Sequence, residues 1–307
     1  MDRLGFGCAT IGGLHGHVPA ADAEAALAAA WAGGVRYFDV APLYGAGEGE
    51  ERLGRFFEGR PRQSYRVSSK VGWRAVEGRC IPDYSRDGVR RTIDESLSRL
   101  GVERLDAAFI HDIDASNHGA DQPRVFAEAM SGALPALLDL RRAGIVDAIG
   151  VGVNDPVVCL AALEHDAFDA FLIAGRYTLL DQLALDTLLP ACLARGVRVI
   201  VGAPFNTGIL AGGMRFGHAA APSDIVDRAR RIAEICHEFD IPLGAAALQF
   251  PIRHPAVSCV LPGPRNASQA GVCAEWMRVA IPSAFWDFLQ ERGFIPQDVP
   301  GAERVPA

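Results

Sequence analysis

The sequence predicts a single (β/α)8 barrel, a TIM barrel of the α/β class, spanning residues 1–307, and three observations support this fold. The chain has 307 residues, long for one ordinary domain but suited to a barrel of this type, which needs about 250 residues. Eight short apolar runs alternate with longer helical patterns along it. No linker rich in Pro, Gly or Ser and no low-complexity tract divides it, so we expect one domain.

The eight apolar runs have the composition of strands. They are rich in Val, Ile and Phe, and most are followed by Gly, Pro or Asn. We place the strands at Leu4–Ala9, Val35–Val40, Arg66–Lys70, Asp106–His111, Asp147–Val151, Asp169–Ile173, Val197–Gly202 and Val257–Leu261. A strand followed by a helix, repeated eight times, favours a closed parallel barrel over an open sheet.

Helical patterns fill most of the gaps between these runs. The clearest ones predict helices over Asp22–Ala32, Arg86–Leu100 and Val125–Arg142. A glycine follows each of them, where a left-handed cap residue is favoured: Gly33, Gly101 and Gly144. The segment after Phe294 is Pro-rich and polar, and we expect a loose tail there.

A doubly wound dinucleotide-binding sheet is the main alternative fold. Such a sheet carries a glycine-rich loop directly after its first strand and an acidic residue at the end of the second. Residues Gly5–Gly12 are glycine-rich, but their spacing is wrong, and no acidic residue ends the next strand in the required role. The barrel therefore remains the better prediction.

Composition restricts the class of partner. The net charge of −7 and the absence of a run rich in Lys or Arg argue against nucleic acid or anionic membranes as partners. No basic start precedes an apolar stretch at the N-terminus, and no segment has the roughly 20 apolar residues that span a bilayer. Seven scattered cysteines without a Cys-x-x-Cys pair indicate reduced thiols and no zinc site. We expect a cytoplasmic monomer or homodimer that binds a small molecule and no metal.

Four polar residues stand at or just beyond the ends of predicted strands. Asp39 ends the second strand region, Lys70 ends the third and His111 ends the fourth, while Tyr44 lies five residues beyond Asp39. The carboxyl ends of barrel strands line the active site, so we expect these side chains to meet on one rim. Each has a simpler structural explanation by itself: a cap, a solvated cation, a turn residue or a strand-end hydrogen bond. No single structural explanation accounts for all four together.

The four residue types suit proton transfer. A tyrosine has a pKa of about 10, too high for an effective base near neutral pH. A lysine about 4 Å away stabilises the phenolate by about 4 kcal/mol at an effective dielectric of 20, but by only about 1 kcal/mol in water. We therefore expect Lys70 to lower the pKa of Tyr44 by two or three units in a poorly hydrated site. Asp39 would hold Lys70 charged, and His111 would donate to the substrate oxygen.

These motifs resemble the aldo-keto reductase family. Tyr37–Gly45 (YFDVAPLYG), Val67–Lys70 and Phe109–His111 are similar to its Asp/Tyr, lysine and histidine segments, and the resemblance runs from about Leu4 to Met277. It implies that Asp39, Tyr44, Lys70 and His111 form a catalytic tetrad, and that a nicotinamide cofactor binds in an extended form without a Rossmann domain.

The resemblance also implies a set of cofactor-binding residues. Asn154 matches the residue that contacts the nicotinamide carboxamide, and residues 260–266 resemble the segment that holds the adenosine end. The complete implied set is Thr10, Asn154, Gly202, Ala203, Pro204, Phe205, Asn206, Gly208, Leu210, Gly263, Arg265 and Gln269.

Three positions depart from the family pattern. Gly202 begins the run that often carries a tyrosine stacked on the nicotinamide, and Phe205 is the nearest aromatic replacement. Ala174 stands in place of a glutamine that often contacts the carboxamide, and Gln269 in place of a basic residue that often binds the 2′-phosphate. The last difference favours NAD as cofactor, with NADP as the alternative. Arg265 remains nearby to pair with a phosphate or to serve as a surface charge at a helix start.

Within the family, residues 174–180 and 202–210 resemble the branch of aldose 1-dehydrogenases, such as those for L-fucose, D-threo-aldose and L-galactose, with pyridoxal 4-dehydrogenase nearby. This predicts oxidation of the anomeric hydroxyl of an aldose to a lactone. Trp73 and Asp112 are candidates for the substrate wall, since an indole face suits a pyranose ring and a carboxylate suits its hydroxyls. His15 and His17 lie in the loop after the first strand, where solvent exposure is the simpler interpretation.

Three alternatives stay open at this point. The substrate could be pyridoxal, whose cyclic hemiacetal presents the same group. The protein could be a general NADPH-dependent carbonyl reductase. It could also be a regulatory subunit that binds cofactor without turnover.

Overall fold

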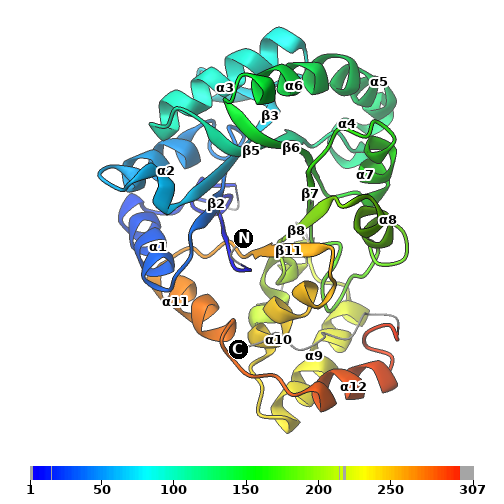
Figure 1. The fold of residues 1–307 in the computed structure, drawn as a ribbon. Coiled ribbons are helices and arrows are strands. Elements are labelled where there is room, and N and C mark those ends of the chain that lie inside the picture. The colour runs from blue at the N-terminus through cyan, green and yellow to red at the C-terminus, as the bar shows by residue number, and fades with distance from the viewer. Residues whose placement is uncertain (1–2, 15, 214, 217–218, 298–307) are drawn as a thin grey trace.

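A computed structural model describes residues 3–14, 16–213, 215–216 and 219–297 of the chain. Eight parallel strands follow one another around a barrel (Figure 1). They are β1 (Phe6–Gly7), β2 (Tyr37–Asp39), β3 (Arg66–Val76), β5 (Leu105–His111), β6 (Val146–Val153), β7 (Ala170–Ala174), β8 (Arg198–Gly202) and β11 (Val257–Leu261). A parallel bridge between Leu4 and Val260 joins the first strand region to the last and closes the barrel. All eight predicted strands are confirmed.

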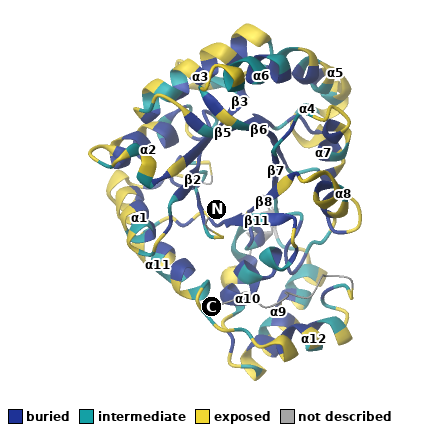
Figure 2. Ribbon diagram, in the orientation of Figure 1, coloured by how far each residue is buried: buried dark blue, intermediate teal, exposed yellow. Residues whose placement is uncertain are grey.

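Helices surround the barrel and cover its outer face (Figure 1). They are α1 (Ala20–Ala32), α2 (Glu48–Phe57), α3 (Arg86–Leu100), α4 (Ala115–His118), α5 (Gln122–Glu128), α6 (Leu134–Arg142), α7 (Pro156–Leu163), α8 (Leu188–Arg195), α9 (Ser223–Glu238), α10 (Leu243–Gln249), α11 (Ala267–Trp276) and α12 (Ser283–Glu291). The strands are buried, while the helices expose their outer sides (Figure 2). The main core therefore lies between the sheet and the helices.

A second, smaller cluster of buried side chains fills the barrel interior. Its members are Tyr37, Phe109, Ala170, Leu172, Ile200, Cys259 and Leu261. Side chains alternate along a strand, so a residue two positions further on points to the same side. Asp39 and His111 follow Tyr37 and Phe109 at that spacing, and Lys70 follows Ser68. This register places three of the four predicted tetrad residues one layer above the packed interior, at the carboxyl end of the barrel.

The third strand is longer than predicted. It continues past Lys70 to Val76 and pairs antiparallel with β4 (Arg79–Asp83), forming a hairpin. The connecting residues Glu77 and Gly78 both have positive φ, 48° and 75°, as a two-residue type I′ turn requires. A further short pair, β9 (Arg215–Phe216) with β10 (Ala219–Ala220), follows β8.

Two helix predictions need correction. The helix predicted over Val125–Arg142 is interrupted by a π-helical turn over Ala129–Ala133. At Gly132 in this turn a Cβ would lie 2.7 Å from the carbonyl oxygen of Tyr84, so the packing there is close. Gly33 is right-handed with a φ of −71° rather than a left-handed cap. The absence of a Cβ at Gly33 instead makes room for Ala274 of α11. A Cβ at this position would lie 2.6 Å from the Cβ of Ala274.

The glycines after the other two helices behave as predicted. Gly101 and Gly144 have φ of 64° and 73°.

The predicted loose tail after Phe294 is wrong at its start, because Ile295 is only 2% exposed and packs into the core. Gln297 donates to the carbonyl oxygen of Gln290 at 3.1 Å. The rest of that prediction, residues 298–307, and the loop residue His15 lie outside the described residues.

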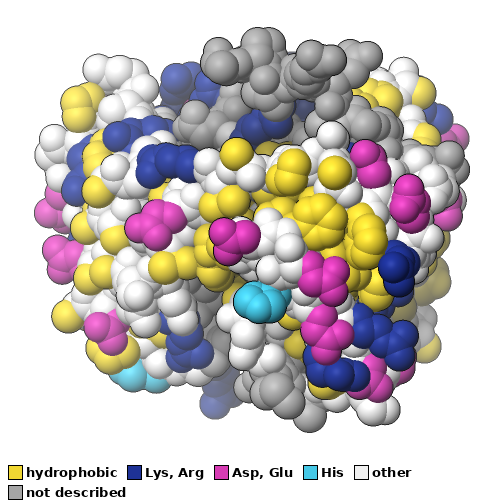
Figure 3. Space-filling view, turned by 90° about the horizontal axis from the view of Figure 1, so that it is seen from below, with side chains coloured by type: hydrophobic (Ala, Val, Ile, Leu, Met, Phe, Trp, Pro, Cys, Tyr) yellow, Lys and Arg dark blue, Asp and Glu magenta, His cyan; other side chains and the backbone are white. Residues whose placement is uncertain are grey.

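The surface and the thiols agree with the composition. All seven cysteines are free, and six of them are buried. On the face shown in Figure 3, acidic and basic side chains are interspersed around hydrophobic ones. In the described part of the chain, no helix has the length and apolarity needed to cross a bilayer.

Two glycine substitutions test the barrel packing. Gly150→Ala places a Cβ 2.1 Å from the carbonyl oxygen of Ala170 on the neighbouring strand. We expect a loss of about 1–3 kcal/mol in the free energy of unfolding, the usual cost of overpacking a core. The matched control Gly271→Ala meets nothing within 4 Å on α11 and should stabilise the protein by about 0.5–1 kcal/mol. Urea unfolding of both variants measures this, and equal midpoints would contradict it.

Candidate active site

The four residues predicted as a tetrad come from three neighbouring strand ends and one loop. Asp39 ends β2, Lys70 lies within β3 beside it, and His111 ends β5. Tyr44 stands in the loop between β2 and α2. All four side chains are largely buried, with residue exposures of 8% or less.

A buried ion pair joins Asp39 to Lys70. The Lys70 Nζ donates to Asp39 Oδ2 at 2.6 Å and to the carbonyl oxygen of Val40 at 2.9 Å. The other carboxylate oxygen, Oδ1, accepts from the Ser68 hydroxyl at 2.8 Å, and the Ser68 oxygen lies 2.8 Å from the Tyr37 hydroxyl. Asp39 is thus held on both oxygens. Its charge raises the pKa of Lys70 despite burial, so the ammonium stays charged.

Lys70 extends to the aromatic ring of Tyr44. Its Nζ lies 4.9 Å from the ring centroid. The ring of His111 meets the Tyr44 ring edge-on, with centroids 6.0 Å apart and an interplanar angle of 84°. The structure therefore brings together the four residues that the sequence placed on one rim.

Glycines fix the position of Tyr44. A Cβ on Gly12, in the loop after β1, would lie 2.6 Å from the Cβ of Tyr44, and one on Gly49 would lie 3.3 Å away. The chain then turns through Gly45, Ala46 and Gly47, all with positive φ, to start α2. The loop after β1 and the first turn of α2 thus pack closely on the Cβ and backbone of Tyr44 and fix the point from which its side chain extends.

The predicted lowering of the Tyr44 pKa is wrong for the protein described here. Burial raises the pKa of Tyr44 to about 12, and the charges of Asp39 and Asp112 raise it too, while Lys70 lowers it. The ion pair with Asp39 compensates the lysine charge, so the loss of hydration has the larger effect. The phenol is therefore protonated at neutral pH.

His111 is an uncharged imidazole. Burial and, to a smaller extent, the charge of Lys70 hold the pKa of His111 well below its usual range. Its Nε2 lies 3.5 Å from Asp112 Oδ1, and its Nδ1 is buried without a hydrogen-bond partner. Burial and the nearby Asp114 carboxylate raise the pKa of Asp112 to about 7. A neutral imidazole with one N–H is suited to donate to an oxygen that gains negative charge.

Trp73, a predicted substrate residue, lies on the hairpin beyond Lys70. Its indole is half-buried and stacks on His118 of α4, with ring centroids 5.7 Å apart and an interplanar angle of 16°. The Trp73 Nε1 is buried without a partner. The hydroxyl of Tyr84 lies 3.1 Å from His118 Nε2 and donates to the carbonyl oxygen of His111 at 2.8 Å. Loops after β3 and β5 thus form an aromatic wall beside His111.

The predicted adenosine-side residues gather where the loops after β1 and β11 meet. A Cβ on Gly263 would lie 2.8 Å from the Thr10 hydroxyl oxygen, so the two loops are in close contact. The Arg265 guanidinium donates to the carbonyl oxygen of His17 at 3.3 Å, and its backbone N–H donates to Gln269 Oε1 at 2.9 Å. Gly263, Arg265 and Gln269 are exposed and accessible to a ligand.

The loop after β8 is strongly turned. Ala203, Asn206, Thr207 and Gly208 all have positive φ, and Ala203 is exposed. The Asn206 side chain is buried and donates from Nδ2 to the Gly175 carbonyl oxygen at 3.1 Å. Gly202 and Pro204 are also buried.

Two residues of this loop that were predicted to bind the cofactor have side chains packed against other residues. The Leu210 side chain is completely buried in the core. The ring of Phe205 packs edge-on against Trp276 of α11, with centroids 5.7 Å apart.

Small residues line the end of the barrel between β7 and β8. Ala174 and Gly202 are register partners, and a Cβ on Gly202 would lie 3.5 Å from that of Ala174. Asn154, at the end of β6, is half-buried, and its backbone N–H donates to Asp114 Oδ2 at 3.0 Å. Asn154, Ala174 and Gly202 stand at the carboxyl ends of β6, β7 and β8, the end of the barrel that carries the tetrad. An amide side chain beside two small residues suits the nicotinamide end of a dinucleotide by its chemistry.

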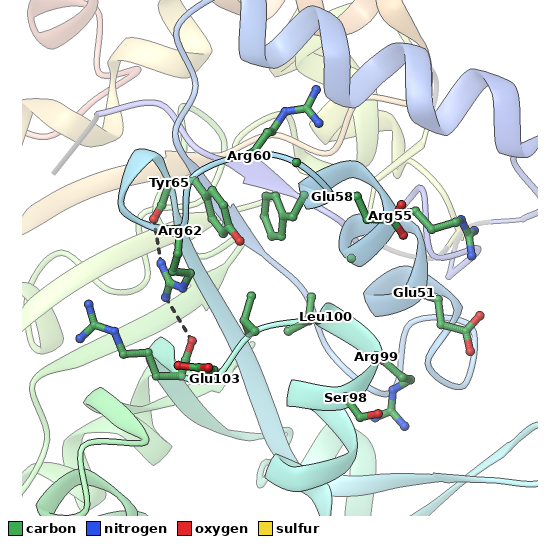
Figure 4. Close-up of a pocket in the computed structure, with 16 residues that line it drawn as sticks. Glu51, Arg55, Glu58, Arg60, Arg62, Tyr65, Ser98, Arg99, Leu100 and Glu103 are labelled. Atoms are coloured by element: carbon green, nitrogen blue, oxygen red, sulfur yellow. Dashed lines mark hydrogen bonds between the residues drawn. The ribbon is translucent and has the colours of Figure 1, made fainter.

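A separate cavity lies at the opposite end of the barrel, near the residues that precede β3 and β5 (Figure 4). Several arginines and glutamates line it, but three of the arginines are already ion-paired. Arg62 lies 2.6 Å from Asp106, Arg99 lies 2.7 Å from Glu50, and Arg104 lies 3.1 Å from Asp147. None of the four tetrad residues faces it. Elsewhere in the described residues, no group of three or more His, Cys, Asp or Glu side chains could hold a metal ion.

Several residues that support the site were not among those predicted from the sequence. Ser68 stands two positions before Lys70, so the strand period alone could have suggested that it shares the barrel interior. The Tyr84 hydroxyl, just after the hairpin, contacts the backbone of His111, and His118 of α4 contacts that hydroxyl. No local sequence pattern indicates either contact.

The chain is similar to one protein family and to several named dehydrogenases along most of its length. A model of the Aldo/keto reductase family matches residues 3–291. Pyridoxal 4-dehydrogenase of Microbacterium luteolum is 39% identical, over 96% of this chain and 95% of that protein. D-threo-aldose 1-dehydrogenase of a Pseudomonas species is 36% identical over the same shares of both chains, and L-galactose dehydrogenase of Arabidopsis thaliana is 30% identical over 88% and 82%.

The fold also has solved counterparts. The holo form of aldo-keto reductase AKR11C1 from Bacillus halodurans superimposes with a TM-score of 0.77 at 22% identity, covering 99% of this chain and 93% of that one. At this identity the likeness concerns the fold.

Replacing Lys70 tests the charge balance around Tyr44. In the wild type, a pKa of about 12 leaves about a tenth of the Tyr44 phenol ionised at pH 11. Lys70→Met removes the positive charge that favours the phenolate, so the pKa of Tyr44 should rise further. Carbon-13 NMR of the tyrosine Cζ resonances follows the titration. A Tyr44 midpoint below 10 in the wild type, or a lower midpoint in the variant, would contradict the analysis.

Proposed function

The chain belongs to the aldo/keto reductase family, and on this premise we propose that it oxidises the hemiacetal hydroxyl of a cyclic substrate to a lactone. The protein is a nicotinamide-dependent oxidoreductase, as the sequence motifs predicted. The observation that carries the proposal is the buried set of Asp39, Lys70, Tyr44 and His111 at the carboxyl end of the barrel.

The residues around the tetrad suit the cofactor by their chemistry. When bound, the nicotinamide supplies the acceptor or donor of hydride. Asn154 would contact its amide group, the exposed backbone at Ala203 would lie against the ring end, and Thr10, Gly263 and Arg265 would hold the adenosine end. Arg265 would pair with a phosphate in place of its bond to the His17 carbonyl.

Tyr44 exchanges the proton. In the oxidative direction, its phenolate accepts the proton of the substrate hydroxyl while hydride leaves the carbon that bears this hydroxyl. Lys70 favours that phenolate: at about 5 Å and an effective dielectric of 20, two unit charges attract by about 3 kcal/mol, or about two pKa units. His111 donates its single N–H to the substrate oxygen and orients it between the imidazole and the phenol.

A cyclic hemiacetal is the chemistry shared by the named relatives. Aldoses close into pyranoses, and pyridoxal closes into a hemiacetal through its hydroxymethyl group, so both present a hydroxyl and a hydrogen on one carbon. The relatives at 39% and 36% identity act on these two substrate types according to their names. Trp73 would lie against the flat or apolar face of either ring, and Asp112 would accept from a substrate hydroxyl.

General carbonyl reduction is a second candidate function, and one observation favours it. The raised pKa keeps the Tyr44 phenol protonated at neutral pH, which is the state that donates a proton to a carbonyl oxygen. The two functions differ in direction and in preferred substrate, so kinetics separates them.

A substrate panel tests the proposal. Rates with L-fucose, D-threo-aldoses, L-galactose, pyridoxal and simple aldehydes are measured with NAD, NADP and their reduced forms, by absorbance of the reduced nicotinamide. We expect oxidation of at least one hemiacetal with NAD preferred, because Gln269 provides no cation for a 2′-phosphate. Faster reduction of simple aldehydes by NADPH would favour the second function. Saturable cofactor binding without turnover on any of them would indicate a binding protein.

Tyr44→Phe removes the proton-transfer group and little else. The ring and its packing against Gly12 remain, so we expect turnover to fall by at least about 100-fold, the usual contribution of general acid–base catalysis. The dissociation constant of the cofactor, measured by fluorescence titration, should stay within about twofold. Turnover near the wild-type rate would exclude Tyr44 as the proton-transfer residue.

The direction of the reaction should set the pH dependence. The oxidative kcat/KM should rise with pH over the neutral range, because oxidation uses the phenolate and the pKa of Tyr44 is raised to about 12. The reductive kcat/KM uses the phenol and should not rise in the same range. An oxidative rate that falls between pH 7 and 9 in a stable protein would contradict the role of Tyr44.

A further inference from the structure

Asp112 turns back towards the residue before it. Neighbouring side chains in a strand point to opposite sides, so the residue after His111 would ordinarily leave the barrel interior. Asp112 instead has a φ of 52°, in the left-handed region, while its backbone N–H still donates to the Gly152 carbonyl oxygen at 2.9 Å. This turn brings its Oδ1 to 3.5 Å from His111 Nε2, with only 14% of the side chain exposed.

The His111 ring has an uneven set of polar neighbours. Its Nε2 faces the Asp112 carboxyl, whereas Nδ1 is buried without a hydrogen-bond partner. A neutral imidazole carries one proton on either nitrogen, and the hydrogen bonds of the ring decide which. An ionised carboxylate accepts only, so it favours the proton on Nε2. A protonated carboxyl can donate to Nε2, which moves the ring proton to Nδ1.

We propose that Asp112 is a positioning residue that sets, through its own protonation state, which ring nitrogen of His111 carries the single ring proton. Ionised Asp112 selects the Nε2–H form, and protonated Asp112 selects the Nδ1–H form. The catalytic consequence rests on the proposed function, because it assumes that His111 donates to the substrate oxygen. The tautomer change itself requires no substrate.

The groups around Asp112 place its ionisation in the neutral range. Lys70 on β3 lowers the pKa of Asp112, whereas burial and Asp114 on the same loop raise it to about 7. Asp114 is fixed by Asn154 and by its own loop, so its charge does not move away. The charge of Asp112 acts on Tyr44 as well and raises the pKa of its phenol.

The hydroxyl of Tyr84 completes the surroundings of Asp112. It donates to the backbone carbonyl oxygens of His111 and Asp112, and it lies 3.1 Å from His118 Nε2. These bonds hold the backbone on which the two side chains stand. Neither ring nitrogen of His111 takes part in them.

Nitrogen-15 NMR of the histidine side chains, on the cofactor-free protein, tests the proposal. In the wild type, the His111 proton should reside on Nε2 at pH 8.5 and shift to Nδ1 by pH 5.5, with a midpoint near 7. The ring stays neutral throughout, because its own pKa is well below the usual range. A proton that stays on one nitrogen over this range would overturn the proposal, and this measurement needs no variant.

Asp112→Asn supplies the matched comparison. The amide has nearly the same shape but does not titrate, so the pH-dependent exchange at His111 should disappear. The loss of a nearby negative charge should also lower the pKa of Tyr44, seen in its Cζ resonance. Asp121→Asn is the control, because that exposed carboxylate pairs with Arg124 away from the site and should leave both titrations unchanged. A His111 exchange with the wild-type midpoint in Asp112→Asn would overturn the proposal.

Because these readouts use no substrate, they can succeed or fail independently of the substrate panel. A confirmed tautomer exchange in a protein that oxidises no hemiacetal would refute the proposed function and leave the role of Asp112 on His111 intact.

Discussion

The buried ion pair between Asp39 and Lys70 is the interaction on which the rest of the site depends. It places a permanent positive charge inside the barrel mouth, within 4.9 Å of the Tyr44 ring centroid. Two buried charges contribute little net stability as a pair, but removing one partner typically costs about 3–5 kcal/mol because the other is left uncompensated. Hydrogen bonds from Lys70 to the Val40 carbonyl oxygen and from Ser68 to Asp39 hold this pair in one geometry. The Tyr37 hydroxyl contacts the Ser68 hydroxyl in turn.

The same ion pair limits what Lys70 can do for Tyr44. A lone lysine would lower the phenol pKa strongly in a dry site, whereas a lysine compensated by Asp39 does not overcome the loss of hydration. Burial therefore has two opposing effects on the site. It excludes water and so strengthens the attraction between Lys70 and a phenolate at Tyr44, but it also favours the neutral phenol. The charge at Asp112 enters this balance too, because it raises the pKa of Tyr44.

The sequence predicted those features that depend on local pattern. Strand composition and the alternation of strands with helices located all eight barrel strands. The positions of Asp39, Lys70 and His111 at the ends of predicted strands placed them at one end of the barrel. The Glu77–Gly78 turn was not predicted. Its glycine, between two strand-like runs, is a local signal for a hairpin turn.

Other features depend on contacts that no local pattern contains. Leu210 resembles a loop residue in sequence, but the fold buries it completely. The raised pKa of Tyr44 follows from three-dimensional burial, and the approach of Asp112 to His111 follows from one left-handed residue. Gly33 caps its helix in a right-handed rather than a left-handed conformation, and its missing side chain makes room for Ala274 of α11, far along the sequence.

A double-mutant cycle on kcat/KM tests most directly whether Asp39 acts through Lys70. Asp39→Asn, Lys70→Met and the double variant are compared with the wild type on one substrate, after circular dichroism has verified that each is folded. If Asp39 serves only to hold and charge Lys70, the double variant will be no slower than Lys70→Met alone. If the two losses multiply instead, the residues act independently, and the ion pair is not the basis of the site.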